Sequence, residues 1–445
     1  MATLYWTGNA HSVKQIDTIT VANTWAAGDT VTCTINGKDL VITCGSTTTT
    51  TATVAAAIKE AWMSATRLDG SSASSNATSN FGGQEFGEFR EITASVSGSV
   101  VTLIANKAGK PFTLTVTEST AGSGTATRAG STTATGKNHW DNGDNWSSGS
   151  VPANDDVVVF KDSDVSCLYG LPNGSLEVTI NVWMSYTGEV GLPAINLDEP
   201  SFPYCEYRQR YVRLDDAGTG TNIAHRFGLG KDGTGCRLFN LKHSTLKCSP
   251  VVYGTGTPLA TRVGTKALNI CCTANNSTIT IVGGSVDCSS QDSGTAAFVT
   301  LTMNGGDVRA VNALYTSGSG VYCRGGVLLL GGTGAINGIN VYGGACRIEN
   351  QTGLVTSLAA FGNGIVEWLS SATVSAASFY DQSTFDARPA AAMGTLSSTY
   401  IYGTGVRFFD PYGGITYTNP ISYYGELSAN ILLGGSLGSA IALTP

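Results

Sequence analysis

The sequence is poor in charge, in histidine and in long apolar runs, and each shortage excludes a class of protein. Charged residues make up 13% of the 445 residues, against about 25% in an ordinary globular domain. The 25 lysines and arginines are spread along the chain, so they form no basic cluster of the kind that binds nucleic acid. No apolar run approaches the roughly 18 residues of a membrane-spanning helix, and the four histidines show no zinc-ligand spacing.

Proline is also scarce, with 12 residues, whereas glycine is abundant, with 56, and serine and threonine take the place of charge. No Gly-X-Y period is present, so collagen is excluded. The N-terminal segment lacks the basic and apolar regions of a signal peptide. We therefore expect synthesis in a cytosol, with the 11 cysteines present as reduced thiols.

A repeat of about 20 residues runs through the C-terminal half. Seven short corner signals begin at Gly283, Gly305, Gly325, Gly343, Asn363, Gln382 and Gly403. Uncharged residues recur two positions before each corner: Ile281, Met303, Cys323, Val341, Phe361, Tyr380 and Ile401. They recur three positions after it, at Val286, Val308, Leu328, Cys346, Val366, Phe385 and Val406, and five positions after it, at Cys288, Ala310, Leu330, Ile348, Trp368, Ala387 and Phe408.

This spacing predicts two strands per repeat, each with one buried face, because apolar residues alternate with period two on both sides of the corner. The alternation changes parity at the corner, where Gly-Gly permits positive φ. A repeat of this length buries its apolar face only by stacking on its neighbours. The fold class predicted is all-β, a parallel β-solenoid with about 20 residues per turn.

Earlier turns of the solenoid are less regular. We place a corner at His243-Ser244, with Leu241, Leu246 and Cys248 facing inward. The segment 267–273 is expected to supply the next turn, and the apolar segments 157–160 and 176–185 are expected to be buried strands nearer the N-terminus.

The segment from residue 16 to about 130 follows a different pattern and predicts a small α+β domain of order ββ-α-βββ. Asn36-Gly37 is a hairpin signal, and a second hairpin is predicted about Ser97-Gly98. One helix is predicted over 51–65, where Val54, Ile58 and Trp62 share a face. The Gly/Ser/Thr-rich segment 121–136 is expected to be a linker.

A tryptophan-rich motif surrounds this insertion. Residues 4–10 and 139–160 are expected to form one unit, containing Trp140, Asn142, Trp146 and Pro152. The motif resembles the segment that opens many bacterial surface β-helix proteins and phage appendages. The resemblance implies a cap on the open end of the solenoid, where unpaired strand edges need cover; the inserted domain also resembles modules of phage structural proteins.

Several motifs suggest chemistry, but each has a simpler structural explanation. The segment 434–438 matches a nucleophile elbow, yet no histidine follows it. The segment 228–233 matches a dinucleotide fingerprint, yet the residues after it predict a strand and not a helix. The acidic residues Asp141, Asp144, Asp155 and Asp156 near His139 suggest a structural cation, but hydrogen bonds within turns explain them more simply.

Carboxylates on the solenoid surface suggest a glycosidase pair. We assign Asp287, Asp307 and Glu367 to one outward-facing column, with Asp287 and Asp307 about 4.8 Å apart on adjacent turns. A second acidic group, Asp198, Glu199, Glu206, Asp215 and Asp216, has no predictable geometry. Outward positions normally carry charge, so we assign no catalytic, cofactor-binding or metal-binding residue.

The C-terminal segment is nearly uncharged, with Tyr412, Tyr417, Tyr423 and Tyr424 before an apolar end, and is expected to form a subunit interface or docking arm. The predicted division is 1–15 and 137–275 for the cap and irregular turns, 16–130 for the small domain, 276–410 for the regular solenoid and 411–445 for the interface segment.

The resemblance and the composition together lead to a functional hypothesis. We expect a non-enzymatic phage virion protein without a cofactor, either a capsid decoration protein or a tail appendage, exposed on the virion surface as a homotrimer. Expected partners are its own copies, other virion proteins such as major capsid or tail proteins, and a host surface glycan, with no nucleic acid or membrane. The alternatives are a tailspike-type polysaccharide-degrading enzyme and a bacterial surface adhesin.

Overall fold

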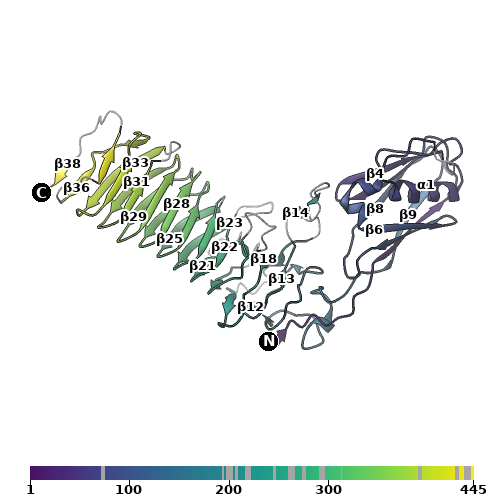
Figure 1. Ribbon diagram of the computed structural model, residues 1–445, viewed down its shortest axis with the longest axis horizontal. Coiled ribbons are helices and arrows are strands. Elements are labelled where there is room, and N and C mark those ends of the chain that lie inside the picture. Colours follow the sequence, from purple (N-terminus) through teal and green to yellow (C-terminus); the bar gives the residue numbers. More distant parts are fainter. Residues whose placement is uncertain are drawn as a thin grey trace.

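The computed structural model describes two bodies with separate hydrophobic cores, a long β-solenoid and a small domain at its N-terminal end (Figure 1). The description covers the chain except residues 72–75, 193–194, 197–203, 206–208, 216–221, 244–246, 259–265, 273–276, 290–295, 312, 389–392, 426–429, 435–441 and 445. The predicted all-β solenoid fold is confirmed, with about 10 turns of about 22 residues each. Within the described residues, no helix is long and apolar enough to span a membrane.

Two parallel sheets form the walls of the solenoid. The first is built from β1 (Thr3–Tyr5), β10 (Val157–Phe160), β12 (Thr179–Trp183), β17 (Arg226–Leu229), β19 (Val251–Val252), β21 (Thr278–Ile281), β23 (Ala296–Met303), β25 (Ala313–Cys323), β27 (Ile336–Val341), β29 (Val355–Ala360), β31 (Thr373–Phe379), β33 (Gly394–Tyr402), β35 (Ile415–Tyr417), β36 (Ser422–Tyr424) and β38 (Ala442–Thr444). The second is built from β11 (Asn173–Gly174), β13 (Glu189–Val190), β16 (Val212–Leu214), β18 (Leu238–His243), β20 (Leu268–Cys272), β22 (Ser285–Asp287), β24 (Asp307–Ala310), β26 (Val327–Leu330), β28 (Ala345–Glu349), β30 (Ile365–Leu369), β32 (Thr384–Asp386), β34 (Arg407–Asp410) and β37 (Ile431–Leu433). A separate antiparallel pair is formed by β14 (Ile195–Asn196) and β15 (Tyr204–Cys205).

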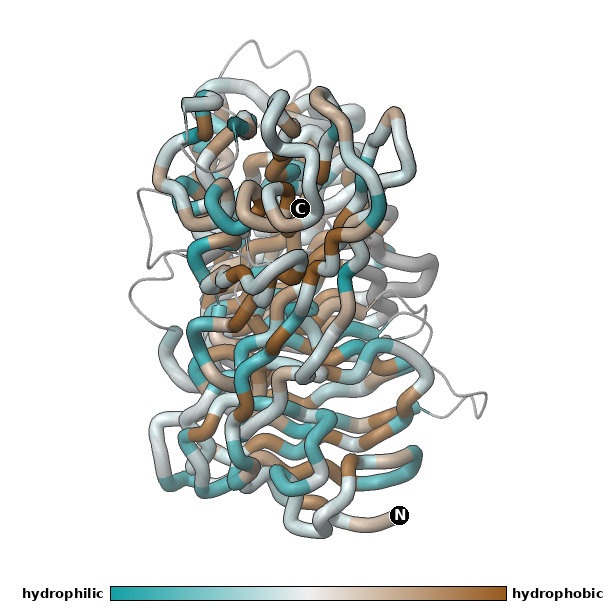
Figure 2. The backbone as a smooth tube through the Cα atoms, turned by 90° about the vertical axis from the view of Figure 1, so that its right-hand side faces the viewer, coloured by the Kyte–Doolittle hydropathy of each residue, from teal (hydrophilic) through white to brown (hydrophobic). Residues whose placement is uncertain are grey.

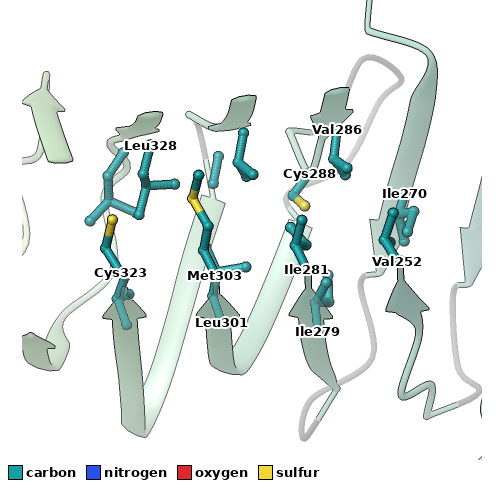
Figure 3. Close-up of a cluster of buried hydrophobic side chains, with 14 of the residues drawn as sticks. Val252, Ile270, Ile279, Ile281, Val286, Cys288, Leu301, Met303, Cys323 and Leu328 are labelled. Atoms are coloured by element: carbon teal, nitrogen blue, oxygen red, sulfur yellow. The ribbon is translucent and has the colours of Figure 1, made fainter. Parts of the chain in front are cut away.

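The predicted apolar columns line the lumen between the two sheets. After the corner, Val286, Val308 and Leu328 pair in register and are fully buried. Hydrophobic residues from all parts of the stack belong to one continuous core. Short hydrophobic stretches alternate with hydrophilic ones along the chain (Figure 2), and Figure 3 shows side chains from both sheets meeting in the lumen. In the four Gly-Gly corners, which begin at Gly283, Gly305, Gly325 and Gly343, the second glycine has positive φ, as at Gly306 (94°) and Gly326 (80°), so the predicted change of parity is produced there.

Two members of the column before the corner were assigned wrongly. The strand partner of Val341 is Ala360, and the next is Phe379, whereas Phe361 and Tyr380 lie one residue further and face outward. The corners of these two turns contain one extra residue. Aromatic side chains occupy the outer position there, so residue type alone indicated the wrong register.

The predicted corner at His243-Ser244 is also wrong. Residues 238–243 form β18, a strand of the second sheet that pairs with β20. Leu241 is fully buried as expected, and so is Cys248, whereas Ser244 and Leu246 lie outside the described residues. The corner of this turn follows β17 instead, because β17 pairs with β19 in the first sheet.

The small domain has two four-stranded antiparallel sheets with a helix against its core. Its elements are β2 (Ile16–Ala22), β3 (Thr30–Ile35), β4 (Lys38–Thr43), α1 (Thr51–Met63), β5 (Thr78–Ser79), η1 (Gly83–Glu85), α2 (Gly87–Arg90), β6 (Ile92–Ser97), β7 (Val100–Ala105), β8 (Thr115–Ser119) and β9 (Thr125–Thr132). The helix and both hairpins are confirmed. The predicted strand order is wrong, because three strands precede α1, and much of the expected linker is β9, paired with β2.

The solenoid continues past the predicted boundary at residue 410. The strands β36 and β38 extend the first sheet from β33, and β37 extends the second sheet from β34. Tyr423 faces the lumen and is 1% exposed. The apolar character of this segment is therefore explained in part by core packing, and the expected interface role concerns only its outward side chains.

Candidate functional site

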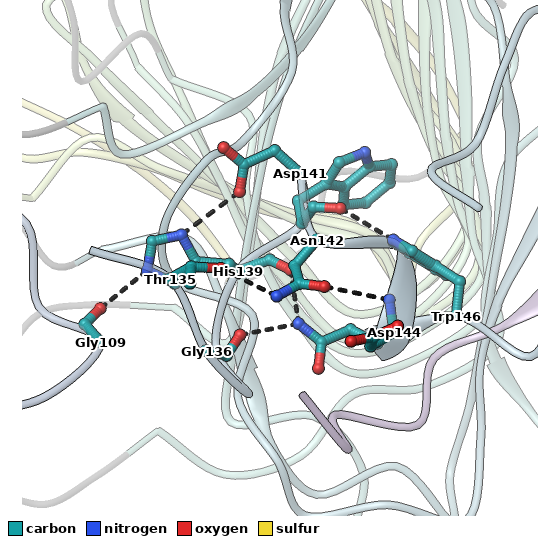
Figure 4. Close-up of polar contacts among 10 residues, drawn as sticks. Gly109, Thr135, Gly136, His139, Asp141, Asn142, Asp144 and Trp146 are labelled. Carbon is teal, nitrogen blue, oxygen red and sulfur yellow. Dashed lines mark hydrogen bonds and ion pairs between the residues drawn. The ribbon is translucent and has the colours of Figure 1, made fainter. Parts of the chain in front are cut away.

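The two halves of the tryptophan motif meet at the N-terminal end of the solenoid, as predicted. The strand β1 pairs with β10, and the ring of Trp6 lies 5.1 Å from that of Trp146, which lies 4.8 Å from that of Trp140. All three rings are 2% exposed. Trp146 donates its indole N–H to the carbonyl of Trp140 at 2.8 Å (Figure 4). The cap therefore covers the N-terminal end of the solenoid with apolar side chains.

Polar residues of the cap join it to the small domain. Nε2 of His139 lies 2.8 Å from the carbonyl oxygen of Gly109 in the small domain, and Nδ1 lies 3.2 Å from Asp141 (Figure 4). This contact lowers the pKa of Asp141. The amide of Asn145 donates to the carbonyls of Gly136 and His139, so the chain leaving the insertion is fixed where it enters the cap.

The acidic residues weighed as cation ligands take part in local hydrogen bonds. Both carboxylate oxygens of Asp156 accept backbone N–H groups, from Ala2 at 2.7 Å and from Ala153 at 3.1 Å, which lowers the pKa of Asp156. The backbone N–H of Asp144 donates to Asn142, and Asp155 has a positive φ of 69°. Within the described part of the chain, no three His, Cys, Asp or Glu residues are placed to hold a metal ion.

The expected pair of Asp287 and Asp307 is contradicted by the register. The ladder partner of Asp287 is Arg309, 3.7 Å away, and Asp287 is fully buried and accepts the backbone N–H of Ser289 at 2.7 Å. Asp307 instead lies opposite Ser285 and forms an ion pair with Lys266. The two carboxylates occupy different columns because Asp307 is two residues after its corner and Asp287 is four.

Glu367 and the other motifs give no catalytic grouping. Glu367 is the ladder partner of Arg347. The segment 228–233 begins with the last two residues of β17 and then turns, and β18 follows it, which agrees with the predicted absence of a helix. Ser436 of the elbow motif lies outside the described residues, as do Asp198, Glu199, Glu206 and Asp216 of the second acidic group.

An aromatic ladder runs along the outside of the solenoid and was not predicted. It consists of Tyr342, Phe361, Tyr380, Tyr402 and Tyr424, each directly before a corner. Successive ring centroids are 4.6 to 4.9 Å apart, with interplanar angles of 7 to 11°. This spacing equals the strand separation of about 4.8 Å, so the stacking follows from the backbone register. The end rings, Tyr342 and Tyr424, are 44% and 36% exposed.

Beside the ladder, the described outer surface of the first sheet has two columns without charge, one over seven turns and the other over eight. Its two outward columns are Thr278, Thr300, Gly320, Gly338, Ser357, Ala376 and Ser398, and Thr280, Thr302, Tyr322, Asn340, Ala359, Ser378, Tyr400 and Ser422. We call these columns the uncharged face. The outer surface of the second sheet, in contrast, carries ion pairs such as Arg347 with Glu349 and Arg388 with Asp386.

The ladder and the uncharged face together form a surface suited to binding. Ring edges, hydroxyls and amides offer apolar contact and uncharged hydrogen bonding in a repeating line. Burial and the neighbouring tyrosines raise the pKa of Tyr402. The sequence contains a signal for this ladder, because each of these aromatic residues comes one position after the true inward column, as Phe361 follows Ala360 and Tyr380 follows Phe379.

A buried histidine pair lies within the irregular turns. Nε2 of His225 is 2.9 Å from Nε2 of His243, and both side chains are fully buried. Nδ1 of His225 accepts the backbone N–H of Ile180 at 3.1 Å, so His225 is neutral with its proton on Nε2. Burial lowers the pKa of His243 to about 4 and that of His225 well below its ordinary value.

Comparison with protein-family models, with curated proteins and with solved structures finds no match to this chain. Its description therefore depends on its own geometry: a capped parallel β-solenoid with a small inserted domain, an aromatic ladder and an uncharged face.

Proposed function

We propose that this protein is a non-enzymatic structural component of a phage virion, exposed on the particle as a homotrimeric capsid decoration protein or tail appendage. The cap carries this proposal. Its residues 139–160 have the motif that resembles the opening segment of phage appendages and bacterial surface β-helix proteins, and Trp140 and Trp146 are buried where a cap requires apolar area.

The division of the molecule supports an attachment role for the small domain. This domain has its own core, around Trp62 and Phe89, and joins the solenoid at the cap, at the end opposite β38 (Figure 1). A rigid rod with a separate domain at one end suits a protein that is anchored through that domain and projects its solenoid outward.

Trimer formation is assigned to the aromatic ladder and the uncharged face. Contact between copies through a charged surface would bring like charges together, because each copy presents the same patch or adjoining patches. The uncharged face avoids this repulsion, and aromatic side chains are enriched at the centres of protein interfaces. A host surface glycan is the second expected partner. The hydroxyl groups of the uncharged face could form hydrogen bonds with a glycan wherever a neighbouring copy does not cover this face.

Immunogold electron microscopy of purified particles, with an antibody to residues 1–130, tests the proposal. Label over the head is expected and would identify a capsid decoration protein. Label at the tail would identify an appendage, and polysaccharide cleavage should then be assayed. Particles without label would contradict the proposal, and a cell-surface adhesin would be tested next by labelling intact cells.

A further inference from the structure

Two buried cysteines face each other inside the solenoid. Sγ of Cys248 lies 2.7 Å from Sγ of Cys272, and both side chains are fully buried. Nonbonded atoms pack at about 3.5–4 Å, and a disulfide bond is about 2.05 Å long. The two sulfurs are therefore closer than ordinary contact allows for separate thiols, and a small shift would bring them to bonding distance.

Cys248 and Cys272 lie at the two ends of one solenoid turn. Cys248 lies three residues before the start of β19, and Cys272 ends β20, the other strand of the same solenoid turn. A bond between them would join the beginning of this turn to its end across the lumen. The adjacent Cys271 is also buried but belongs to the opposite side of β20, outside the lumen cluster that contains Cys272.

We propose that Cys248 and Cys272 form a disulfide bond that closes one turn of the solenoid, at the junction between its irregular and regular parts. The oxidant is a protein or small-molecule disulfide that meets the chain before this turn closes. The thiolate of one cysteine attacks that disulfide and displaces one thiolate. The second cysteine thiolate then attacks the mixed disulfide, so two electrons and two protons leave the protein and the oxidant becomes two thiols.

The burial of the two thiols determines when the disulfide bond can form. The contact with Cys248 and burial raise the pKa of Cys272 well above its ordinary value, and a buried neutral thiol is a poor nucleophile. The bond must form as the chain folds, and once formed it is shielded from reductants in the same lumen. A bond that closes a loop of this kind stabilises the fold by restricting the unfolded chain.

The test uses full-length protein from two expression hosts, one with a reducing and one with an oxidising cytosol. Free thiols are alkylated under denaturing conditions, and digested peptides are analysed by mass spectrometry. We expect a peptide pair linked through Cys248 and Cys272 from the oxidising host, about 2 Da lighter than the two thiol peptides together, and a higher melting temperature that reductant in denaturant abolishes.

Variants and alternative pairings make the result decisive. Cys271→Ser should retain the linked peptide, whereas Cys248→Ser should lose it together with the gain in melting temperature. Full alkylation of Cys248 and Cys272 in protein from the oxidising host would overturn the proposal. A predominant bond between Cys272 and Cys288, the next cysteine in the lumen, would overturn it as well.

Discussion

The corner glycines allow the stacking of the solenoid to be tested with a single methyl group. Gly326 has φ of 80°, and a Cβ built on it would lie 2.8 Å from the backbone nitrogen of Gly306 and closer still to its carbonyl oxygen. Gly149, in the cap, has a similar φ of 71° but open space around its Cβ position. Gly149→Ala is therefore a matched control that carries the conformational cost without the clash.

The expected magnitudes differ enough to be resolved. A left-handed conformation costs a residue with a side chain about 1–2 kcal/mol, and this cost applies to both variants. Overpacking against neighbouring atoms adds about 1–3 kcal/mol, here at Gly326 only, where backbone has little freedom to yield. We expect Gly326→Ala to lower the free energy of unfolding by about 2–5 kcal/mol and Gly149→Ala by about 1–2 kcal/mol.

The assay is urea unfolding followed by circular dichroism and tryptophan fluorescence, with both variants and the parent protein measured side by side. A change in the transition midpoint at constant slope reports stability alone. Equal losses for the two variants would refute the reasoning, because they would show that contact between successive corners does not fix their spacing. A larger loss at Gly149 would also refute it.

Three further outcomes are expected. Val308→Asp should abolish folding, because it buries an unpaired charge in the lumen, whereas the outward Thr302→Asp should yield soluble, protease-resistant protein. Burial lowers the pKa of His243 to about 4 from an ordinary value near 6.5. Between these two pH values the unfolded chain binds a proton that the folded chain does not. The free energy of unfolding should therefore be unaffected by His243 above pH about 6.5 and fall by on the order of 3 kcal/mol as the pH drops to about 4. Urea midpoints across this range would check it, and a flat profile would contradict it. Tyr402→Ser should weaken trimer formation by about 2 kcal/mol per subunit in analytical ultracentrifugation, and an equal effect of Tyr412→Ser, an exposed tyrosine outside the ladder, would contradict the assigned interface.

The solenoid could be predicted from the sequence because apolar and polar residues alternate strictly in those strands whose inner side chains are fully buried. Val308 and Leu328 could be placed in one column since every turn needs a lumen residue at that point. Phe361 and Tyr380 were misplaced for a physical reason: an aromatic side chain is favourable both in a lumen and in an outer stack. Only the length of the corner distinguishes the two positions, and corner length is set by backbone geometry that composition does not reveal.

Candidate site residues were harder to predict than the fold. Asp287 occupies a position where charge normally meets solvent, yet it is fully buried beside Arg309. The histidine pair could not be predicted either. His225 directly precedes β17 of the first sheet and His243 ends β18 of the second, and the register between these strands depends on irregular turns. Such contacts are set by the exact path of long connections, which carry no periodic signal.

The aromatic ladder shows how a solenoid converts a repeated sequence position into a continuous surface. One aromatic residue before one corner would be an isolated exposed ring, but the constant register places the next ring 4.6 to 4.9 Å away. The second sheet carries outward charges at regular intervals, as where Arg347 lies opposite Glu367. The proposed partner surface and the charged surface are thereby separated on opposite sides of each corner. Because both follow from the corner geometry, a change that shifts one corner should disturb the ladder and the lumen together.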